Sequence, residues 1–203
     1  MTRADAFAAG TLKLVTGDAL IIVDVQRDFL PGGSLAVPSG QEVIGPLNRI
    51  IKLFEAQRLP VFATRDWHPA NHASFRSEGG SWPPHCIAGS AGAQFSPDLD
   101  LPRGATVVSK ATEREVEAYS GFEKTGLEVL LKEAGVKRVV IGGLATDYCV
   151  LRTVTDAVRF GFKVFLLADA VRAVNIAPRD GEKALDEMKN AGAEIIVSGD
   201  LTE

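Results

Sequence analysis

The sequence predicts an α/β fold, a doubly wound and mostly parallel six-stranded sheet with helices on both faces. Six short apolar runs alternate with segments of helical periodicity along the 203 residues. The first run, residues 19–23, is apolar throughout, which is typical of a strand buried on both faces. The other runs lie at residues 61–64, 106–109, 139–141, 164–168 and 195–197. This length suits one domain, which we expect over residues 1–203, with an N-terminal extension (1–17) of unknown role.

Four helices are expected between the strands. Apolar residues from Leu47 to Phe54 follow i, i+3, i+4, i+7 spacing, and Pro46 suits the first turn of that helix. Thr125 and Glu128 have the spacing of a capping box that opens the second helix. The second, third and fourth helices are predicted at residues 126–134, 147–160 and 178–192, with glycines at 135, 161 and 192 as the stops.

Composition excludes several classes of protein. The chain has no run of 18 apolar residues, so no membrane span is expected. Its formal net charge is −4 and it has no cluster of Lys and Arg, which argues against a nucleic-acid partner. The first residues lack the pattern of a secretory signal. Two cysteines are too few for a disulfide framework, and a reducing, cytoplasmic location is expected.

Polar side chains follow three of the predicted strands. Asp24 comes directly after residues 19–23, Lys110 follows residues 106–109, and Cys149 lies in the turn after 139–141. Because sites in such sheets form beyond the carboxyl ends of the strands, we expect these three side chains to meet at one edge. Taken singly, each has an ordinary alternative: a carboxylate that caps a loop, a solvent-facing lysine and a small buried side chain.

Cys149 has the sequence context of a nucleophile. If Thr146 caps the following helix, Cys149 occupies the third helical position. The unpaired N–H groups and the dipole at a helix start favour a thiolate and bind an oxyanion. Cys86 lies in a loop beside His85, and we expect it to be structural or incidental.

The segment from residue 66 to residue 104 has no clear periodicity, yet it holds both tryptophans and all three histidines. A loop of this length in a small domain is usually functional when it is not disordered. Asp66 and His68 form an Asp-x-His pair, and His72 and His85 follow. A carboxylate with imidazoles suits Zn, Mn or Fe(II), so one divalent metal ion is predicted; the alternative is three unrelated loop histidines.

Aromatic residues lie near these candidates in non-periodic segments: Phe29, Trp82, Tyr119 and Phe122. They are able to wall a pocket for a flat ring, and ordinary loop packing is the alternative for each one.

Five motifs, in this order, resemble those of the nicotinamidase (pyrazinamidase) family within the isochorismatase-like hydrolase superfamily. The resemblance extends from about residue 19 to residue 173. The motifs are DVQRDFLPGGSLAVP, TRDWHPANHASF, WPPHC, AYSGFE and GLATDYCVLRTVTDA.

The resemblance implies an activity: hydrolysis of nicotinamide to nicotinic acid and ammonia, and of pyrazinamide to pyrazinoic acid, through a cysteine thioester in NAD salvage. The partner is then a small azine carboxamide, and a homo-oligomer is compatible with the sequence. The implied catalytic triad is Cys149, Asp24 and Lys110, and the implied metal ligands are Asp66, His68 and His85. The resemblance also implies a cis peptide bond before Ala145, an oxyanion hole made by the Ala145 and Cys149 amides, and a pocket with Phe29, Trp82 and Tyr119. His72 is left outside the metal ligands.

Other functions remain to be separated from this one. A related amidase acting on a carbamoyl or ureido substrate generally lacks the metal set, and isochorismatase itself has no need of a cysteine nucleophile. A metallohydrolase would attack with metal-bound hydroxide, and its activity would survive loss of Cys149 but not chelation of the metal. A non-catalytic receiver domain also places Asp and Lys at strand ends, but it has no reason to carry the long histidine-containing loop.

Overall fold

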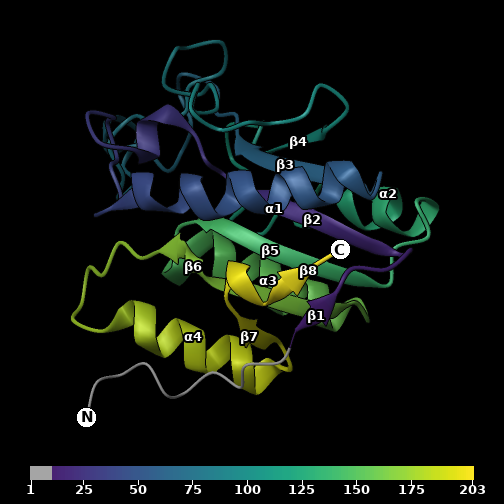
Figure 1. Ribbon diagram of the computed structural model, residues 1–203. Helices are drawn as coiled ribbons and strands as arrows, with labels where there is room; N and C mark the ends of the chain where they lie inside the picture. The colour runs from purple at the N-terminus through teal and green to yellow at the C-terminus, as the bar shows by residue number, and fades with distance from the viewer. Residues whose placement is uncertain (1–10) are drawn as a thin grey trace.

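The computed structural model describes residues 11–203 and contains the predicted six-stranded parallel sheet. The strand order is β4-β3-β2-β5-β6-β7, with every neighbouring pair parallel. The strands are β2 (Asp18–Val23), β3 (Val61–Asp66), β4 (Thr106–Lys110), β5 (Arg138–Leu144), β6 (Lys163–Arg172) and β7 (Glu194–Ile196) (Figure 1). Every predicted run lies within or across one of these strands, so the predicted sheet is confirmed.

Helices cover both faces, as predicted. On one face, Leu47 and Phe54 of α1 (Ile44–Ala56) pack with Leu20 and Ile22 of β2. On the other face, Ile21 packs with the apolar sides of α2 (Leu127–Glu133), α3 (Leu151–Arg159) and α4 (Asp180–Ala191). Alternate residues of β2 therefore serve two separate apolar layers, which explains why the whole strand is apolar and buried.

The expected glycine stops are present: Gly135, Gly161 and Gly192 all have positive φ angles and follow α2, α3 and α4. The predicted capping box of α2 is wrong. The Thr125 hydroxyl accepts the N–H of Leu127 at 3.3 Å, and Glu128 bonds to Lys132 one turn later instead of reaching back. A local hydroxyl turn therefore replaces the reciprocal pair.

A second, two-stranded sheet was not predicted. β1 (Leu12–Lys13) pairs in parallel with β8 (Leu201–Thr202). Of the predicted extension, residues 1–10 lie outside the described residues, and the remainder contains β1. Asp18 and Arg138 form a two-pronged ion pair, with Oδ1–Nε and Oδ2–Nη2 distances of 2.5 and 2.6 Å, and Arg138 also bonds to the Lys13 carbonyl. These contacts hold β1 against the main sheet. No helix formed by residues 11–203 has the length and apolarity to cross a bilayer.

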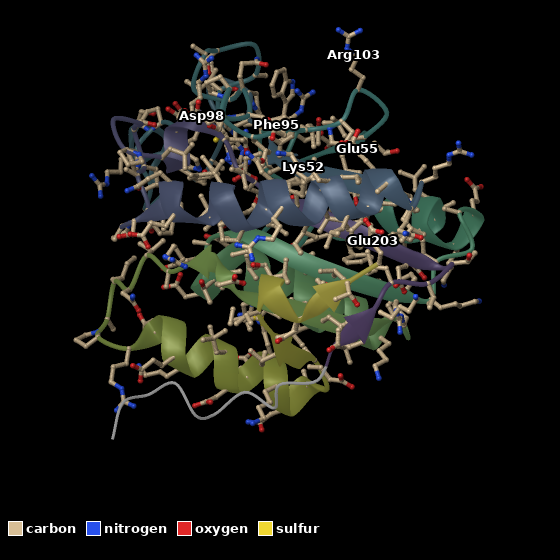
Figure 2. All side chains as sticks on the ribbon, in the orientation of Figure 1. Lys52, Glu55, Phe95, Asp98, Arg103 and Glu203 are labelled. Carbon is tan, nitrogen blue, oxygen red and sulfur yellow. The ribbon has the colours of Figure 1, made fainter. Side chains whose placement is uncertain are left out.

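The long segment between β3 and β4 has little regular structure, as predicted, and its helical content is one 3₁₀ turn (Arg76–Glu78). It lies above α1 in Figures 1 and 2. Asn48 of α1 bonds to the backbone of Asp98 and Asp100 at 2.8 and 2.9 Å, which fixes the end of the segment over the helix. Its first part turns across the carboxyl ends of the strands, where the histidines gather.

Candidate active site

The three predicted strand-end residues meet at the carboxyl edge of the sheet. Asp24 follows β2 with a φ of 50°, and Lys110 ends β4 opposite Asp66, its register partner on β3. Cys149 lies in the turn after β5. The four residues come from four adjacent strands or the turns after them, as the rule for parallel sheets requires.

Lys110 is the centre of this cluster. Its ammonium lies 3.0 Å from Asp24 Oδ2, 3.4 Å from Cys149 Sγ and 3.1 Å from the Ala118 carbonyl, and it also pairs with Asp66 Oδ1. The side chain of Lys110 is fully buried. The other carboxylate oxygen of Asp24 accepts a hydrogen bond from Thr64 Oγ1 at 2.7 Å. One buried ammonium thus forms ion pairs with two buried carboxylates and contacts a sulfur.

These contacts set the charges. Burial raises the pKa of Asp24, and nearby Asp66 adds to the effect, although Lys110 opposes it. Burial alone would disfavour the ammonium, but Asp24 and Asp66 outweigh it and raise the pKa of Lys110 well above its usual value. Burial also raises the pKa of Cys149, and both carboxylates contribute. Burial and the two carboxylates therefore oppose the thiolate that the helix start favours, and the Cys149 thiol has the Asp24 carboxylate beside it.

The turn that carries Cys149 differs from the predicted helix start. Ala145, not Thr146, has extended cap dihedrals, and residues Thr146–Val150 form a π-helical turn ahead of α3. The Ala145 carbonyl accepts N–H bonds from both Tyr148 and Val150 at 3.1 Å. The peptide bond between Leu144 and Ala145 is cis, as the resemblance implied. Ala145 and Cys149, the expected oxyanion-hole residues, both line the same cavity.

Asp66, His68 and His85 form a set of ligands beside this cluster. Their candidate ligand atoms all lie within 4.8 Å of one another, and all three residues are buried. His68 Nδ1 lies 3.2 Å from the Ala111 carbonyl and His85 Nδ1 lies 2.8 Å from the Pro83 carbonyl. Since a carbonyl only accepts, each Nδ1 carries the hydrogen and each Nε2 keeps its lone pair. Burial lowers the pKa of His68 to about 4 and lowers that of His85, so both rings are neutral. This donor set fits a divalent metal ion.

His72 is buried beside the set but is not part of it. Its ring lies 4.2 Å from that of His68, centroid to centroid. Nε2 lies 3.0 Å from the Val116 carbonyl, and Nδ1 lies 2.8 Å from Ser74 Oγ. Both nitrogens are engaged, so neither has a lone pair for a metal.

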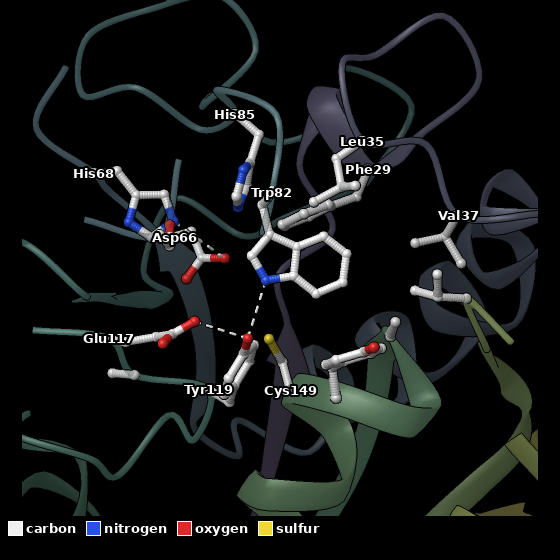
Figure 3. Close-up of a pocket in the computed structure, with 15 residues that line it drawn as sticks. Phe29, Leu35, Val37, Asp66, His68, Trp82, His85, Glu117, Tyr119 and Cys149 are labelled. Atoms are coloured by element: carbon white, nitrogen blue, oxygen red, sulfur yellow. Dashed lines mark hydrogen bonds and ion pairs between the residues drawn. The ribbon is translucent and has the colours of Figure 1, made fainter. Parts of the chain in front are cut away.

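A cavity connects the thiol to the ligand set (Figure 3). The expected aromatics Phe29, Trp82 and Tyr119 line it. Phe122 does not; it packs on Phe160 of the helical layer, with ring centroids 5.4 Å apart. Several lining residues were not predicted: Leu35, Val37, Ser74, Glu117, Ala118, Tyr148 and Val174. Of these, Tyr148 had a usable signal, because it is the aromatic neighbour of Cys149.

Gln26 was also missed. Its buried amide donates to the carbonyls of Asp66 and Ala93 at 2.8 and 2.9 Å and accepts the Asp66 N–H at 2.8 Å. It thereby fixes the backbone that presents Asp66. Cys86, expected to be structural, is fully buried and donates its N–H to Asp28 Oδ2 at 2.7 Å.

Comparison with known proteins agrees with this geometry. A family model described as the isochorismatase domain matches residues 18–200. A nicotinamidase of Escherichia coli (strain K12) is 39% identical over 206 residues, covering 91% of this chain and 97% of the relative.

Solved structures are similar over nearly the whole chain. A pyrazinamidase of Pyrococcus horikoshii in complex with zinc has a TM-score of 0.86 and 51% identity, covering 89% of this chain and 99% of that one. A PnC1 protein of L. infantum in complex with nicotinate has a TM-score of 0.86 and 38% identity, covering 97% of each chain.

Proposed function

This chain belongs to the isochorismatase-domain family, and we propose that Cys149 is the nucleophile with which it hydrolyses nicotinamide to nicotinate and ammonia. The chain is an amidohydrolase by its similarity to curated nicotinamidases. The observation that carries the role of Cys149 is its position, with its sulfur 3.4 Å from the buried Lys110 ammonium and at the wall of a cavity lined by the metal-ligand set.

The first step is a proton transfer within the buried cluster. Asp24, Asp66 and Cys149 have side-chain atoms within 4.8 Å of one another. Asp24 takes the thiol proton as the sulfur attacks the carboxamide carbon, and Lys110 stabilises the thiolate that forms. The raised pKa of Asp24 makes it a stronger base than an exposed carboxylate. The carboxamide oxygen becomes an oxyanion, and the Ala145 and Cys149 amides donate to it.

The intermediate then collapses. The carbon–nitrogen bond breaks, Asp24 returns the proton to the leaving nitrogen, and ammonia departs from a thioester of Cys149. Asp24 next removes a proton from water, whose oxygen attacks the thioester carbon. The carbon–sulfur bond breaks, Asp24 returns its proton to sulfur, and nicotinic acid leaves with the thiol restored and gives its own proton to the solvent as nicotinate.

The ligand set orients the ring. A divalent ion held by Asp66, His68 and His85 would supply a Lewis-acid contact for the ring nitrogen of an azine carboxamide. Phe29 and Trp82 supply apolar faces for the flat ring. Pyrazinamide offers a ring nitrogen in the same position relative to the carboxamide, so we propose it as a second substrate. Both cysteines are free and buried, which supports a reducing, cytoplasmic location.

The test is ammonia release from nicotinamide by the metal-loaded enzyme. Cys149→Ala is expected to lower turnover by at least about 10³-fold, as loss of a nucleophile does in other hydrolases. The matched control is Cys86→Ala, which removes the other buried cysteine and is expected to retain most of the activity. A Cys149→Ala enzyme that keeps its rate but loses it to a chelator would instead support a metal-bound hydroxide. Turnover of ureido compounds but not of nicotinamide would support the related amidases.

A further inference from the structure

Three side chains at the wall of the cavity form a hydrogen-bonded chain. Trp82 Nε1 donates to the Tyr119 hydroxyl at 3.1 Å, and that hydroxyl donates to Glu117 Oε1 at 2.8 Å. Figure 3 draws both bonds, with the Trp82 indole facing the cavity and Glu117 at the far end of the chain. Trp82 and Tyr119 are predicted pocket residues, whereas no role was predicted for Glu117.

The two hydrogen bonds run in one direction, from Trp82 through Tyr119 to Glu117. An indole N–H only donates, and an ionised carboxylate only accepts. A phenol hydroxyl does both. Tyr119 therefore donates its hydroxyl hydrogen bond to Glu117, and its oxygen accepts the hydrogen bond from Trp82. Each bond of such a chain strengthens the next by polarisation. Without the carboxylate, the O–H bond is free to rotate, and the lone pairs of the oxygen are no longer held toward the Trp82 N–H.

These residues also separate two hollows. Trp82, Tyr119 and Glu117 line the cavity that holds Cys149, and the same three residues line an adjoining hollow that includes Arg76 and Ile176. The indole packs edge-on against Tyr148, with centroids 5.3 Å apart. Its N–H donates to the Tyr119 hydroxyl. The backbone of Trp82 is held by Ser74 and Arg76, and the Tyr119 oxygen holds the polar edge of the indole.

Glu117 has no competing partner among residues 11–203. The nearby Arg114 pairs with Glu78 and with Glu115. No ion pair of the described residues includes Glu117, and its carboxylate oxygen is bonded to Tyr119. The carboxylate is therefore available to orient the hydroxyl.

We propose that Glu117 is a positioning residue for substrate binding, which acts through the Tyr119 hydroxyl to hold the Trp82 indole at the wall of the ring pocket. This inference rests on the proposed nicotinamide hydrolysis. Glu117 does not touch the reacting atoms in this mechanism, so its loss raises the KM for nicotinamide and leaves kcat largely unchanged.

The experiment measures kcat and KM for nicotinamide in Glu117→Ala, Glu117→Gln and Tyr119→Phe. Loss of one such hydrogen bond is expected to raise KM about three- to tenfold in Glu117→Ala. Glu117→Gln keeps an acceptor oxygen and is expected to restore KM to within about twofold of the wild type. Glu113→Ala is the matched control, because Glu113 is exposed on the same segment and is not in the cavity wall.

A double-mutant cycle provides the decisive comparison. If Glu117 acts through Tyr119, then adding Glu117→Ala to the Tyr119→Phe variant changes KM no further. An equal increase in KM with and without the Tyr119 hydroxyl would overturn the proposal, as would an unchanged KM in Glu117→Ala or a failure of Glu117→Gln to restore it.

Binding in the absence of turnover separates this proposal from the proposed function. Nicotinamide titrated into Cys149→Ala, with and without Glu117→Ala, is expected to bind about three- to tenfold more weakly when the carboxylate is missing. A wild-type enzyme that releases no ammonia refutes the hydrolysis itself, whereas equal affinity in the two variants refutes the role of Glu117 alone.

Discussion

Lys110→Met tests whether the buried ammonium holds the active site together. The Lys110 ammonium lies 3.0 Å from Asp24 Oδ2 and also pairs with Asp66, and neither Lys110 nor Asp24 has an exposed side chain. At an effective dielectric constant of about 20, two charges 3 Å apart attract by about 5 kcal/mol. Loss of one partner from a buried pair lowers the free energy of unfolding by about 3–5 kcal/mol, because the remaining charge is left without compensation. We expect a loss of that size.

The assay is urea unfolding followed by tryptophan fluorescence at pH 5 and pH 8. Burial already raises the pKa of Asp24, and removal of Lys110 raises it further. Asp24 in the variant therefore takes up a proton at the lower pH and escapes the penalty of a bare buried charge. The loss of stability is expected to be smaller at pH 5 than at pH 8. Adding Asp24→Asn neutralises the same carboxylate and is expected to recover part of the stability at pH 8, with no recovery of turnover.

Lys52→Met is the matched control. Lys52 forms an ion pair with Asp100 at 3.6 Å, but its side chain is 71% exposed. Exposed pairs contribute about 0–1 kcal/mol, so this variant is expected to unfold almost like the wild type. Equal losses of stability in the two lysine variants would contradict a role for the buried pair. A loss in Lys110→Met that is the same at both pH values, with no recovery by Asp24→Asn, would contradict it as well.

Removal of the metal by a chelator is expected to raise the KM for nicotinamide far more than it lowers kcat, because the nucleophile is a sulfur; steady-state kinetics before and after readdition of Zn²⁺ measure both, and an unchanged KM contradicts the assigned role. In the metal-free chain, burial lowers the pKa of His68 from an ordinary 6.5 to about 4. Between these pH values the unfolded chain binds a proton that the folded chain does not, so the free energy of unfolding falls as the pH drops from 6.5 to 4. His68→Gln is expected to flatten this dependence of the free energy of unfolding on pH, and an unaltered slope would argue against it. Gly143→Ala is expected to lower the free energy of unfolding by more than about 3 kcal/mol, because φ is +130° and the new Cβ would lie 2.1 Å from the Val23 carbonyl oxygen. The control is Gly45→Ala in α1, whose Cβ meets no atom within 4 Å and which is expected to be neutral or stabilising by up to about 1 kcal/mol. Urea midpoints compare the two variants, and equal midpoints would contradict the steric clash at Gly143.

The sheet and the buried charges were predictable because they depend on rules that act along the chain. Parallel strands place their carboxyl ends at one edge, so Asp24, Lys110 and Cys149 had to approach one another once the strands were recognised. The residues alone indicated this meeting, and the family resemblance then gave each residue a role.

Other features depend on contacts between distant segments, which no local pattern encodes. His72 is kept from the metal-ligand set by the Val116 carbonyl, and His68 is prepared for it by the Ala111 carbonyl, each more than 40 residues away. Glu117 is linked to the cavity wall because Tyr119, its neighbour in sequence, accepts a hydrogen bond from the distant Trp82. The raised pKa of Cys149 was not predictable for a related reason: a helix start was visible in the sequence, but burial beside two carboxylates was not.

The shared position of Lys110 has a consequence for how the site responds to change. Asp66 is both a member of the metal-ligand set and a partner of the ammonium that stabilises the Cys149 sulfur. A divalent ion held by Asp66 would compete with Lys110 for that carboxylate, and Asp24 and the sulfur would remain as the partners of the Lys110 ammonium. Variants of Asp66 therefore alter the thiol as well as the metal, and their effects will not add to those of Lys110 variants. The proposed ring-binding and bond-breaking parts of the site are thus connected through one buried lysine.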